Sequence, residues 1–294
     1  MGKILEKLKD GRVLVSDGAW GTFLHQKGLK ADECPESWNL HRPDDVLEIA
    51  RSYVIAGADI ILTNSFGGSP FKLEGYGLRD QTFEINRAAA EISRKAAGDQ
   101  VLVLGSIGPT GKMVFMGEVT EVELLEGIKE QARGLMAGGA DGIIIETMSD
   151  LQEAQAAIAA SRSVTDLDIG CTFTFSLTAD NEYKTMMGTG IEEYLEMVKS
   201  AGVQIAGANC GNGTAGMIEI VKQIRQIDPD IPVLVHANAG LPLYRDGETV
   251  FPESAEEMAP QMKDLVAAGA NIVGGCCGTT PAHISLIVQL LKTK

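Results

Sequence analysis

Short apolar runs alternate with longer amphipathic segments along the chain, and the alternation occurs eight times. The short runs are bounded by turn residues and carry few charges, as is typical of buried parallel strands. We therefore predict strands at residues 13–16, 60–63, 101–106, 142–145, 169–175, 204–208, 233–236 and 271–274. Apolar residues at three- and four-residue spacing predict helices between them, at residues 44–56, 81–97, 122–137, 151–163, 191–201, 215–227, 255–268 and 282–291.

A glycine recurs where four of the predicted helices should end, in residues 56–59, 138–141, 201–204 and 268–271. Such a glycine can take the left-handed conformation that ends a helix. The four copies precede the second, fourth, sixth and eighth strands, so the chain reads as four βαβα units. Eight strand–helix pairs favour the α/β class and a (β/α)8 TIM barrel over an open doubly wound sheet, which usually has about five or six strands. Without a linker or a shift in composition, residues 1–294 are predicted to form one domain.

The composition narrows the class of protein. Apolar residues make up 45% of the 294 positions and charged residues 22%, which is ordinary for a globular protein. A net charge of −15 disfavours nucleic acid or an anionic membrane as partner, because both attract clustered Lys and Arg. Charges interrupt the apolar pattern of residues 1–10, which predicts a short amphipathic helix rather than a signal peptide. We expect a cytoplasmic protein with no membrane or nucleic-acid partner.

Three of the five cysteines follow predicted strands beside glycines: Cys210 after the sixth strand, and Cys276 and Cys277 after the eighth. Active sites of such barrels form from the loops after the strands, and only one strand separates the sixth from the eighth. The three thiols can therefore converge on one ion, and three sulfurs leave one tetrahedral position on Zn²⁺ open. Cys34 and Cys171 are interpreted as small buried hydrophobic residues.

Two carboxylates end predicted strands. Asp17 follows the first strand and Glu146 the fourth, so both should face the mouth of the barrel, where a carboxylate can bind a substrate ammonium group. A solvated turn or a helix cap is the alternative for each. Residues 63–69 and 236–240 supply amides, hydroxyls and backbone N–H groups that suit a small polar ligand, although ordinary turns use the same residues. His236 is close to this site but can equally be a packed strand residue.

Several motifs resemble those of one known family. They are residues 17–22 (Asp-Gly-Ala-Trp-Gly-Thr), 63–67 (Thr-Asn-Ser-Phe-Gly), 105–110 (Gly-Ser-Ile-Gly-Pro-Thr), 145–147 (Ile-Glu-Thr), 209–210 (Asn-Cys) and 274–278 (Gly-Gly-Cys-Cys-Gly). Across essentially its whole length, the chain resembles the homocysteine S-methyltransferase family, and most closely the homocysteine-binding domain of cobalamin-dependent methionine synthases. The last two motifs together are highly specific for that family.

The resemblance implies a barrel in which three cysteine thiolates bind zinc and the substrate thiol takes the fourth position. Cys210, Cys276 and Cys277 inherit the ligand role. It also implies that backbone N–H groups near the first strand hold the carboxylate of homocysteine and that acidic side chains hold its ammonium group. Together with the polar loops, this predicts substrate contacts from Asp17, Gly18, Ala19, Trp20, Asn64, Ser65, Glu146, Asn209 and Asn238. Trp20 stands where a methionine is common in the family.

Residues 235–242 (Val-His-Ala-Asn-Ala-Gly-Leu-Pro) resemble the methionine synthase branch of the family. That branch implies a methyl-corrinoid (cobalamin) donor supplied by methyltetrahydrofolate, carried on a separate corrinoid protein or on further methionine synthase domains. S-methylmethionine or betaine as donor is the alternative within the family. From other classes, a phosphate-binding barrel lyase or isomerase could use Gly274 and Gly275 after the eighth strand, and a non-catalytic metal-binding protein is a third hypothesis.

Overall fold

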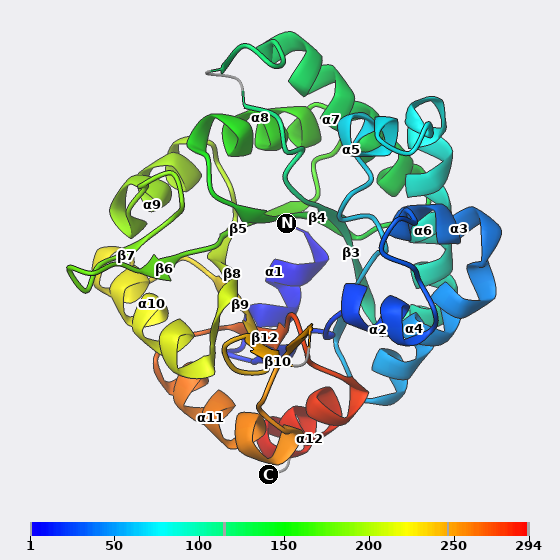
Figure 1. Ribbon diagram of the computed structural model, residues 1–294. Helices are drawn as coiled ribbons and strands as arrows, with labels where there is room; N and C mark the ends of the chain where they lie inside the picture. Colours follow the sequence, from blue (N-terminus) through cyan, green and yellow to red (C-terminus); the bar gives the residue numbers. More distant parts are fainter. Residues whose placement is uncertain (1, 114–115, 246, 293–294) are drawn as a thin grey trace.

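Eight parallel strands form the centre of the computed structural model, which describes residues 2–113, 116–245 and 247–292, and helices form a ring around them (Figure 1). Around the sheet the order is β1 (Leu14–Val15), β12 (Ile272–Gly275), β9 (Val233–Asn238), β8 (Ile205–Gly213), β5 (Asp168–Phe173), β4 (Gly142–Met148), β3 (Leu102–Ile107) and β2 (Ile60–Leu62). A parallel bridge between Ser16 and Ile60 joins the two ends of this order. The sheet is therefore closed, and the predicted (β/α)8 barrel is confirmed.

All eight predicted helices are present, and none of their ends moves by more than one residue. They are α4 (Pro43–Ile55), α6 (Thr82–Ala97), α7 (Glu121–Ala137), α8 (Leu151–Arg162), α9 (Ile191–Ser200), α10 (Thr214–Ile227), α11 (Ala255–Ala267) and α12 (Pro281–Lys292). Shorter elements precede or separate them: α1 (Lys3–Leu8), α2 (Gly21–Gln26), η1 (Pro35–Ser37), α3 (Trp38–His41), α5 (Pro70–Glu74), η2 (Arg79–Gln81) and the hairpins β6 (Ser176–Leu177) with β7 (Tyr183–Lys184) and β10 (Leu243–Arg245) with β11 (Glu248–Val250). In the described ranges no helix is long and apolar enough to cross a membrane.

Two strands run at least three residues further than predicted. The sequence pattern places their ends at Ile145 and Ala208, whereas β4 continues to Met148 and β8 to Gly213. The pairing register shifts in both extensions, between Ile145 and Met148 and between Asn209 and Gly213. A local irregularity of this kind redirects side chains at the end of a strand, and these extensions carry several of the predicted site residues.

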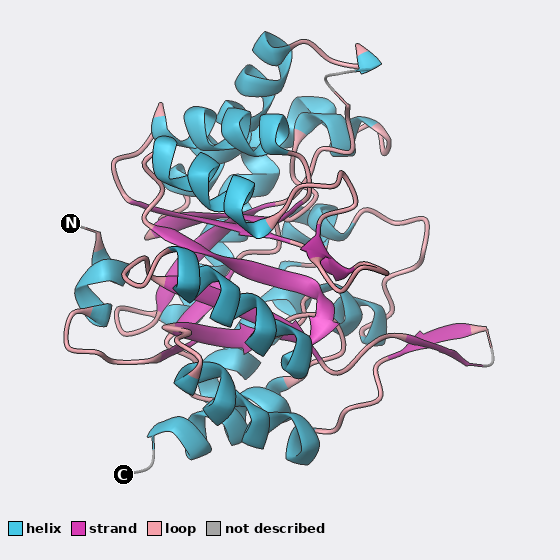
Figure 2. Cartoon of the chain, turned by 90° about the vertical axis from the view of Figure 1, so that its left-hand side faces the viewer, coloured by secondary structure: helices cyan, strands magenta, loops and turns pink. Residues whose placement is uncertain are grey.

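The helix α1 closes one end of the barrel. Ile4 is fully buried and belongs to one apolar cluster with the strand residues Leu14, Ile60, Leu62, Leu102, Leu104, Ile144, Ile205, Leu234 and Ile272. The carboxylate of Asp168 accepts hydrogen bonds from the N–H groups of Ile4 and Leu5, at 2.9 and 3.2 Å, which satisfies the first turn of the helix. Figure 2 shows α1 at the end of the barrel opposite the projecting hairpin β10–β11. The open end is therefore the one formed by the carboxyl ends of the strands.

Each of the four repeated glycine turns is followed by a polar residue that bonds to the strand before it. Asp59, Asp141, Gln204 and Asn271 accept hydrogen bonds from the backbone N–H groups of Val15, Val103, Ile169 and Val233, at 2.8 to 3.0 Å. A cation from a neighbouring helix bonds both to that side chain and to the glycine carbonyl: Lys292 with Gly57, Arg94 with Gly139, Arg162 with Gly202, and Arg225 with Gly269. We call these four sets the basal latches. They confirm the fourfold βαβα organisation.

Side-chain carboxylates also join β1 to β2, where the two strands share a single bridge. The Asp59 latch reaches Val15 from one side, and the N–H of Asp59 donates to the Val15 carbonyl at 2.7 Å. Closer to the open end, the N–H of Leu62 donates to the carboxylate of Asp17 at 2.8 Å. The carboxylates therefore replace ladder hydrogen bonds that these very short strands do not form.

Candidate metal and substrate site

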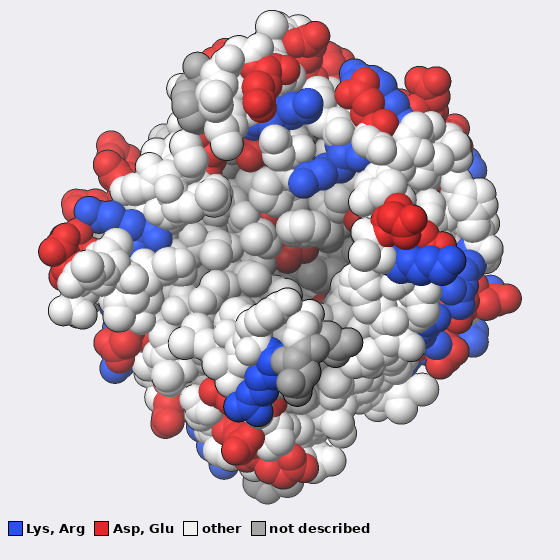
Figure 3. All heavy atoms as spheres, viewed as in Figure 1, with Lys and Arg blue, Asp and Glu red and all other residues white. Residues whose placement is uncertain are grey.

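A cavity of about 270 Å³ opens at the carboxyl ends of the strands. Figure 3 looks onto this end and shows the hollow at its centre, with atoms of acidic side chains inside it and mainly uncharged residues around it. The cavity is lined by Gly18, Ala19, Trp20, Gly21, Thr22, Leu24, Pro35, Glu36, Leu62, Thr63, Asn64, Ser65, Phe66, Ser106, Glu146, His236, Gly275, Cys276 and Cys277.

The three predicted thiols converge at one wall of the cavity. Cys210 lies in the extension of β8, and Cys276 and Cys277 follow β12. Their Sγ atoms all lie within 4.8 Å of one another, and all three residues are half-buried. The loop after β12 is fixed to β9, because the N–H of Cys276 donates to the Ala237 carbonyl at 2.7 Å. Strand topology therefore brings together sulfurs that are distant in sequence, as the strand positions predicted.

The thiols of this cluster differ in the direction in which their pKa is shifted. Hydrogen bonds from Cys276 and Cys277 lower the pKa of the Cys210 thiol well below its ordinary value, and Asn238 contributes in the same direction. Donating to Cys210 raises the pKa of Cys276 instead. One thiolate is thus stabilised by two thiol donors. Thiolates are the form of cysteine that binds metals, and a divalent cation would displace the remaining protons.

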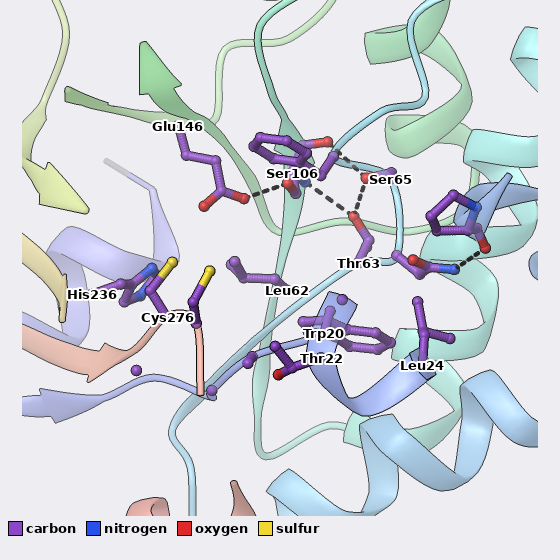
Figure 4. Close-up of a pocket in the computed structure, with 18 of the residues that line it drawn as sticks. Trp20, Thr22, Leu24, Leu62, Thr63, Ser65, Ser106, Glu146, His236 and Cys276 are labelled. Carbon is purple, nitrogen blue, oxygen red and sulfur yellow. Dashed lines mark hydrogen bonds between the residues drawn. The ribbon is translucent and has the colours of Figure 1, made fainter. Parts of the chain in front are cut away.

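Glu146 ends the regular part of β4 and points into the cavity, where Figure 4 shows it bonded to Ser106. The Ser106 hydroxyl donates to Oε1 at 2.5 Å, and the Asn209 amide lies 3.4 Å from Oε2. Burial raises the pKa of Glu146 to about 7, and the negative charges of Asp17 and Cys210 add to the rise. A cation bound beside this carboxylate would reverse that effect, because an opposite charge favours the ionised form.

Asp17 is placed differently from Glu146. It is buried behind the cavity wall, and its Oδ2 accepts hydrogen bonds from the N–H of Leu62 at 2.8 Å and from the indole N–H of Trp20 at 2.9 Å. The Ser16 hydroxyl donates to Oδ1 at 3.2 Å. Burial raises the pKa of Asp17 to about 7 despite these donors. Asp17 therefore orients Trp20, which lines the cavity, instead of lining it itself.

The loop after β1 is joined to the loop after β12 by one threonine. The Thr279 hydroxyl accepts from the N–H of Ala19 at 3.0 Å and donates to the Cys276 carbonyl at 2.7 Å. A Cβ on Gly275 would lie 2.2 Å from this hydroxyl oxygen, so only glycine fits there. Beyond this contact the chain enters α2, whose first residues Gly21 and Thr22 line the cavity. The first N–H groups of a helix lack intrahelical partners and attract anions.

Six of the nine predicted substrate contacts line the cavity: Gly18, Ala19, Trp20, Asn64, Ser65 and Glu146. The side chains of Asn64 and Ser65 bond within the protein, Asn64 to the Pro35 carbonyl at 2.8 Å and Ser65 to the Ser106 carbonyl at 2.7 Å. Asp17, Asn209 and Asn238 lie behind the lining. Their direct contact with substrate stays a prediction.

One further carboxyl group and one imidazole ring border the cavity. Glu36 of η1 is buried and accepts from the N–H of Gly67 at 2.6 Å, and burial raises its pKa. No sequence signal identifies it, because η1 lies far from any predicted strand end. His236 faces the cavity from β9, and burial lowers its pKa to about 4, so the ring is neutral. Ser106 could have been found, because it ends the predicted third strand.

The phosphate-binding alternative is not supported at the loops after β9 and β12. The N–H of Gly275 donates to the Asp17 carbonyl at 2.9 Å, and that of Cys276 to the Ala237 carbonyl. The N–H of Ala239 donates to the Cys277 carbonyl at 3.0 Å. Backbone N–H groups that would hold a phosphate are thus occupied by the protein itself.

Comparisons with known proteins agree with this geometry. The family model for homocysteine S-methyltransferase matches residues 14–291. The methionine synthases of Mycobacterium tuberculosis and Mycobacterium leprae are each 34% identical to this chain, over 287 and 295 residues, which is 93% and 96% of the chain. The chain spans only 24% of the length of each of these relatives.

Among solved structures, the metallated form of the homocysteine methyltransferase MmuM from Escherichia coli has a similar fold. Its TM-score is 0.75 at 23% identity, and the match covers 97% of this chain and 98% of MmuM. This likeness supports the barrel architecture alone, whereas the family model covers nearly the whole chain. The chain therefore belongs to the homocysteine S-methyltransferase family.

Proposed function

We propose that this barrel, as one domain, methylates the sulfur of homocysteine to give methionine, with zinc held by Cys210, Cys276 and Cys277. The observation that carries the proposal is the position of the thiol cluster. Its sulfurs lie within 4.8 Å of one another at the wall of a cavity that Glu146 also lines. A storage site for metal would not need such a cavity. Free half-buried thiols also persist best in a reducing compartment, which supports a cytoplasmic location.

The donor set fits zinc. Thiolates are ligands that zinc prefers, and the sulfurs of Cys210, Cys276 and Cys277, within 4.8 Å of one another, would hold one ion. Three thiolates leave one position for a further ligand, and Cys276 and Cys277 border the cavity from which it would come. When bound, zinc supplies a Lewis acid that lowers the pKa of a thiol brought to that position.

The cavity walls would select an amino acid that carries the thiol. Glu146 is proposed to bind the ammonium group, and the N–H groups at the start of α2 to bind the carboxylate. Trp20, Leu24 and Leu62 supply the apolar walls. These walls exclude water, which strengthens the charge interactions inside and holds the sulfur in one orientation. In the transfer, the sulfur forms a bond to the methyl carbon, the bond from that carbon to the donor breaks, and the thiol proton is lost.

A methyl-corrinoid group, on a corrinoid protein or on further methionine synthase domains, is the methyl donor that we propose. The support is the 34% identity to two methionine synthases, together with apolar residues around the open end. Many of the large hydrophobic side chains exposed in the described residues lie in the loops and hairpins that follow β2, β3, β5 and β9. Among them are Phe66, Met113, Met116, Leu177, Met186, Met187, Leu241, Leu243, Tyr244 and Val250. This set, which we call the mouth rim, would contact the donor-carrying partner.

Metal analysis and calorimetry test the proposed site. The purified protein should contain zinc in stoichiometric amount and bind homocysteine, whereas Cys210→Ala, Cys276→Ala and Cys277→Ala should lose the zinc and keep the fold. Cys34→Ala, which removes a thiol outside the cluster, should keep both properties. Glu146→Gln should keep the zinc and bind homocysteine roughly tenfold more weakly or worse. Full zinc occupancy in Cys276→Ala would contradict the proposal.

Variants of the mouth rim test the partner. Met186 and Tyr244 are 84% and 78% exposed, and Ile55, which is 85% exposed at the end of α4, is a matched control away from the rim. Met186→Ser with Tyr244→Ser should raise the KM for a corrinoid protein several-fold and leave the use of free methylcobalamin unchanged. Ile55→Ser should change neither. Equal effects of the rim variant on both donors would argue against a docking role.

A further inference from the structure

Two residues of the site adopt backbone conformations that are unusual for their type. Thr147 follows Glu146 with a φ of +62°, and Cys210 follows Asn209 with a φ of +58°. The left-handed region is unfavourable for residues with a Cβ and especially for a β-branched one, at a cost of about 1 to 3 kcal/mol. Both residues lie in the irregular extensions of β4 and β8. Some contact must hold Thr147 in this conformation.

The side chain of Asn209 makes that contact with both of its polar atoms. Its Oδ1 accepts from the N–H of Thr147 at 2.8 Å, and its Nδ2 donates to the Thr147 hydroxyl at 2.7 Å. Oδ1 also accepts from the Thr172 hydroxyl at 2.7 Å, and Nδ2 lies 3.4 Å from Oε2 of Glu146. Asn209 is fully buried, so water cannot replace these bonds.

The backbone of Asn209 connects these contacts directly to the thiol cluster. Cys210 is its neighbour in the chain, and the Thr174 hydroxyl fixes the Asn209 carbonyl at 2.9 Å. One side chain thus joins the strand end that carries Glu146 to the strand end that carries a proposed zinc ligand. Asn209 is not among the described residues that line the cavity, so its place in the site is set by its contacts with Thr147 and Glu146.

We infer that Asn209 is a positioning residue that fixes Glu146 relative to Cys210, so that the ammonium group and the thiol of one substrate are recognised together. This inference rests on the proposed function. Asparagine suits the role because it offers an acceptor to the Thr147 N–H and a donor to the Thr147 hydroxyl at the same time. Aspartate would lack the amide donor and would place a negative charge beside Glu146.

The inference predicts a loss of selectivity that a general structural role would not give. The probes are homocysteine and 4-mercaptobutyrate, which has the same thiol and carboxylate and no amino group. In calorimetry on the zinc-loaded protein, Asn209→Ala should bind homocysteine roughly tenfold more weakly and 4-mercaptobutyrate about as well as the unchanged protein does. Zinc content should be unaltered. Equal weakening for both thiols, or unchanged homocysteine affinity, would overturn the inference.

Substitutions at Thr147 provide a second test that leaves Asn209 in place. Thr147→Ala and Thr147→Gly both lack the hydroxyl, but only glycine adopts a positive φ without strain. Thr147→Gly should therefore bind homocysteine several-fold more tightly than Thr147→Ala. Combined with Asn209→Ala in one protein, Thr147→Gly should restore part of the homocysteine affinity that Asn209→Ala loses. Equal affinities for the two Thr147 variants would overturn the inference. If the unchanged protein binds neither thiol, the proposed function itself fails.

Discussion

Two buried carboxylates at the same end of the barrel, Asp17 and Glu146, differ in their hydrogen bonds and in their access to the cavity. Asp17 accepts from Leu62, Trp20 and Ser16 and has no free side toward the cavity. Glu146 accepts from Ser106 and faces the cavity. A strand-end carboxylate is therefore a ligand-binding candidate only if its neighbours leave an oxygen accessible. In this chain Trp20 stands where a methionine is common in the family. Its indole N–H donates a hydrogen bond to the Asp17 carboxylate.

The raised pKa of Asp17 predicts a pH-dependent cost to folding. Burial raises this pKa from 3.8 to about 7, so the folded state binds the proton more tightly than the unfolded state does. Stability is then greatest below pH 4 for this group and falls as the pH rises to 7. Asp17→Asn keeps the shape and removes the titration. Between pH 4 and pH 8 in urea unfolding, the unchanged protein should lose about 2 to 4 kcal/mol more than Asp17→Asn does.

An exposed aspartate provides the control for this measurement. Asp99→Asn alters a side chain at the protein surface and should follow the unchanged protein at both pH values. If Asp17→Asn also follows it, then Asp17 is ionised in the folded state without cost, and the hydrogen bonds from Leu62 and Trp20 outweigh its burial.

At the scale of elements, each basal latch contributes to the free energy of unfolding through hydrogen bonds at its glycine turn. Arg225 donates to the carbonyls of Gly269, Asp228 and Ile231 and to the side chain of Asn271. Arg225→Ala leaves several of these acceptors without a partner and should lower the free energy of unfolding by about 2 to 4 kcal/mol. Lys222→Ala on the same helix removes only an exposed ion pair with Glu219 and should change it by less than about 0.5 kcal/mol. Urea unfolding of both variants checks this, and similar effects would refute the latch.

Sequence patterns predicted the elements of this barrel well because the pattern and the fold depend on the same periodicity. The carboxyl ends of four helices were accurate since the glycine of the following turn marks them, as at Gly57 and Gly269. The extensions of β4 and β8 were missed because left-handed Thr147 and Cys210 have no recognisable sequence pattern. The thiol cluster and the position of Glu146 at the cavity followed from the predicted strand ends. The approach of Glu36 to the cavity and the direction of the Asn209 side chain depend on tertiary contacts. Hydrophobic periodicity does not describe such contacts.

At the scale of the whole molecule, the two ends of the barrel contain different kinds of residues. The end closed by α1 contains apolar packing and the basal latches, and the open end contains the cavity and the thiol cluster. Ile4→Ala would leave a hole in the fully buried interior and should cost about 2 to 5 kcal/mol of stability. Zinc content and homocysteine affinity should stay unchanged below the unfolding transition. Lys9→Ala, exposed just after the same helix, is the control.

A parallel loss of homocysteine affinity in Ile4→Ala, measured where the protein is fully folded, would show that the two ends are coupled. Separation of the ends is the expected result, because the layers of the barrel interior lie between Ile4 and the cavity.

The basal latches also bear on how such a barrel can change during evolution. Each latch fixes one βαβα unit at the closed end, so the loops at the open end can lengthen, shorten or be exchanged without altering the frame. A lineage could then replace the mouth rim, the proposed docking surface for a donor-carrying partner, while Cys210, Cys276 and Cys277 stay in place. Under selection for a new donor, accepted substitutions should accumulate around the mouth, whereas the residues of the latches should tolerate few.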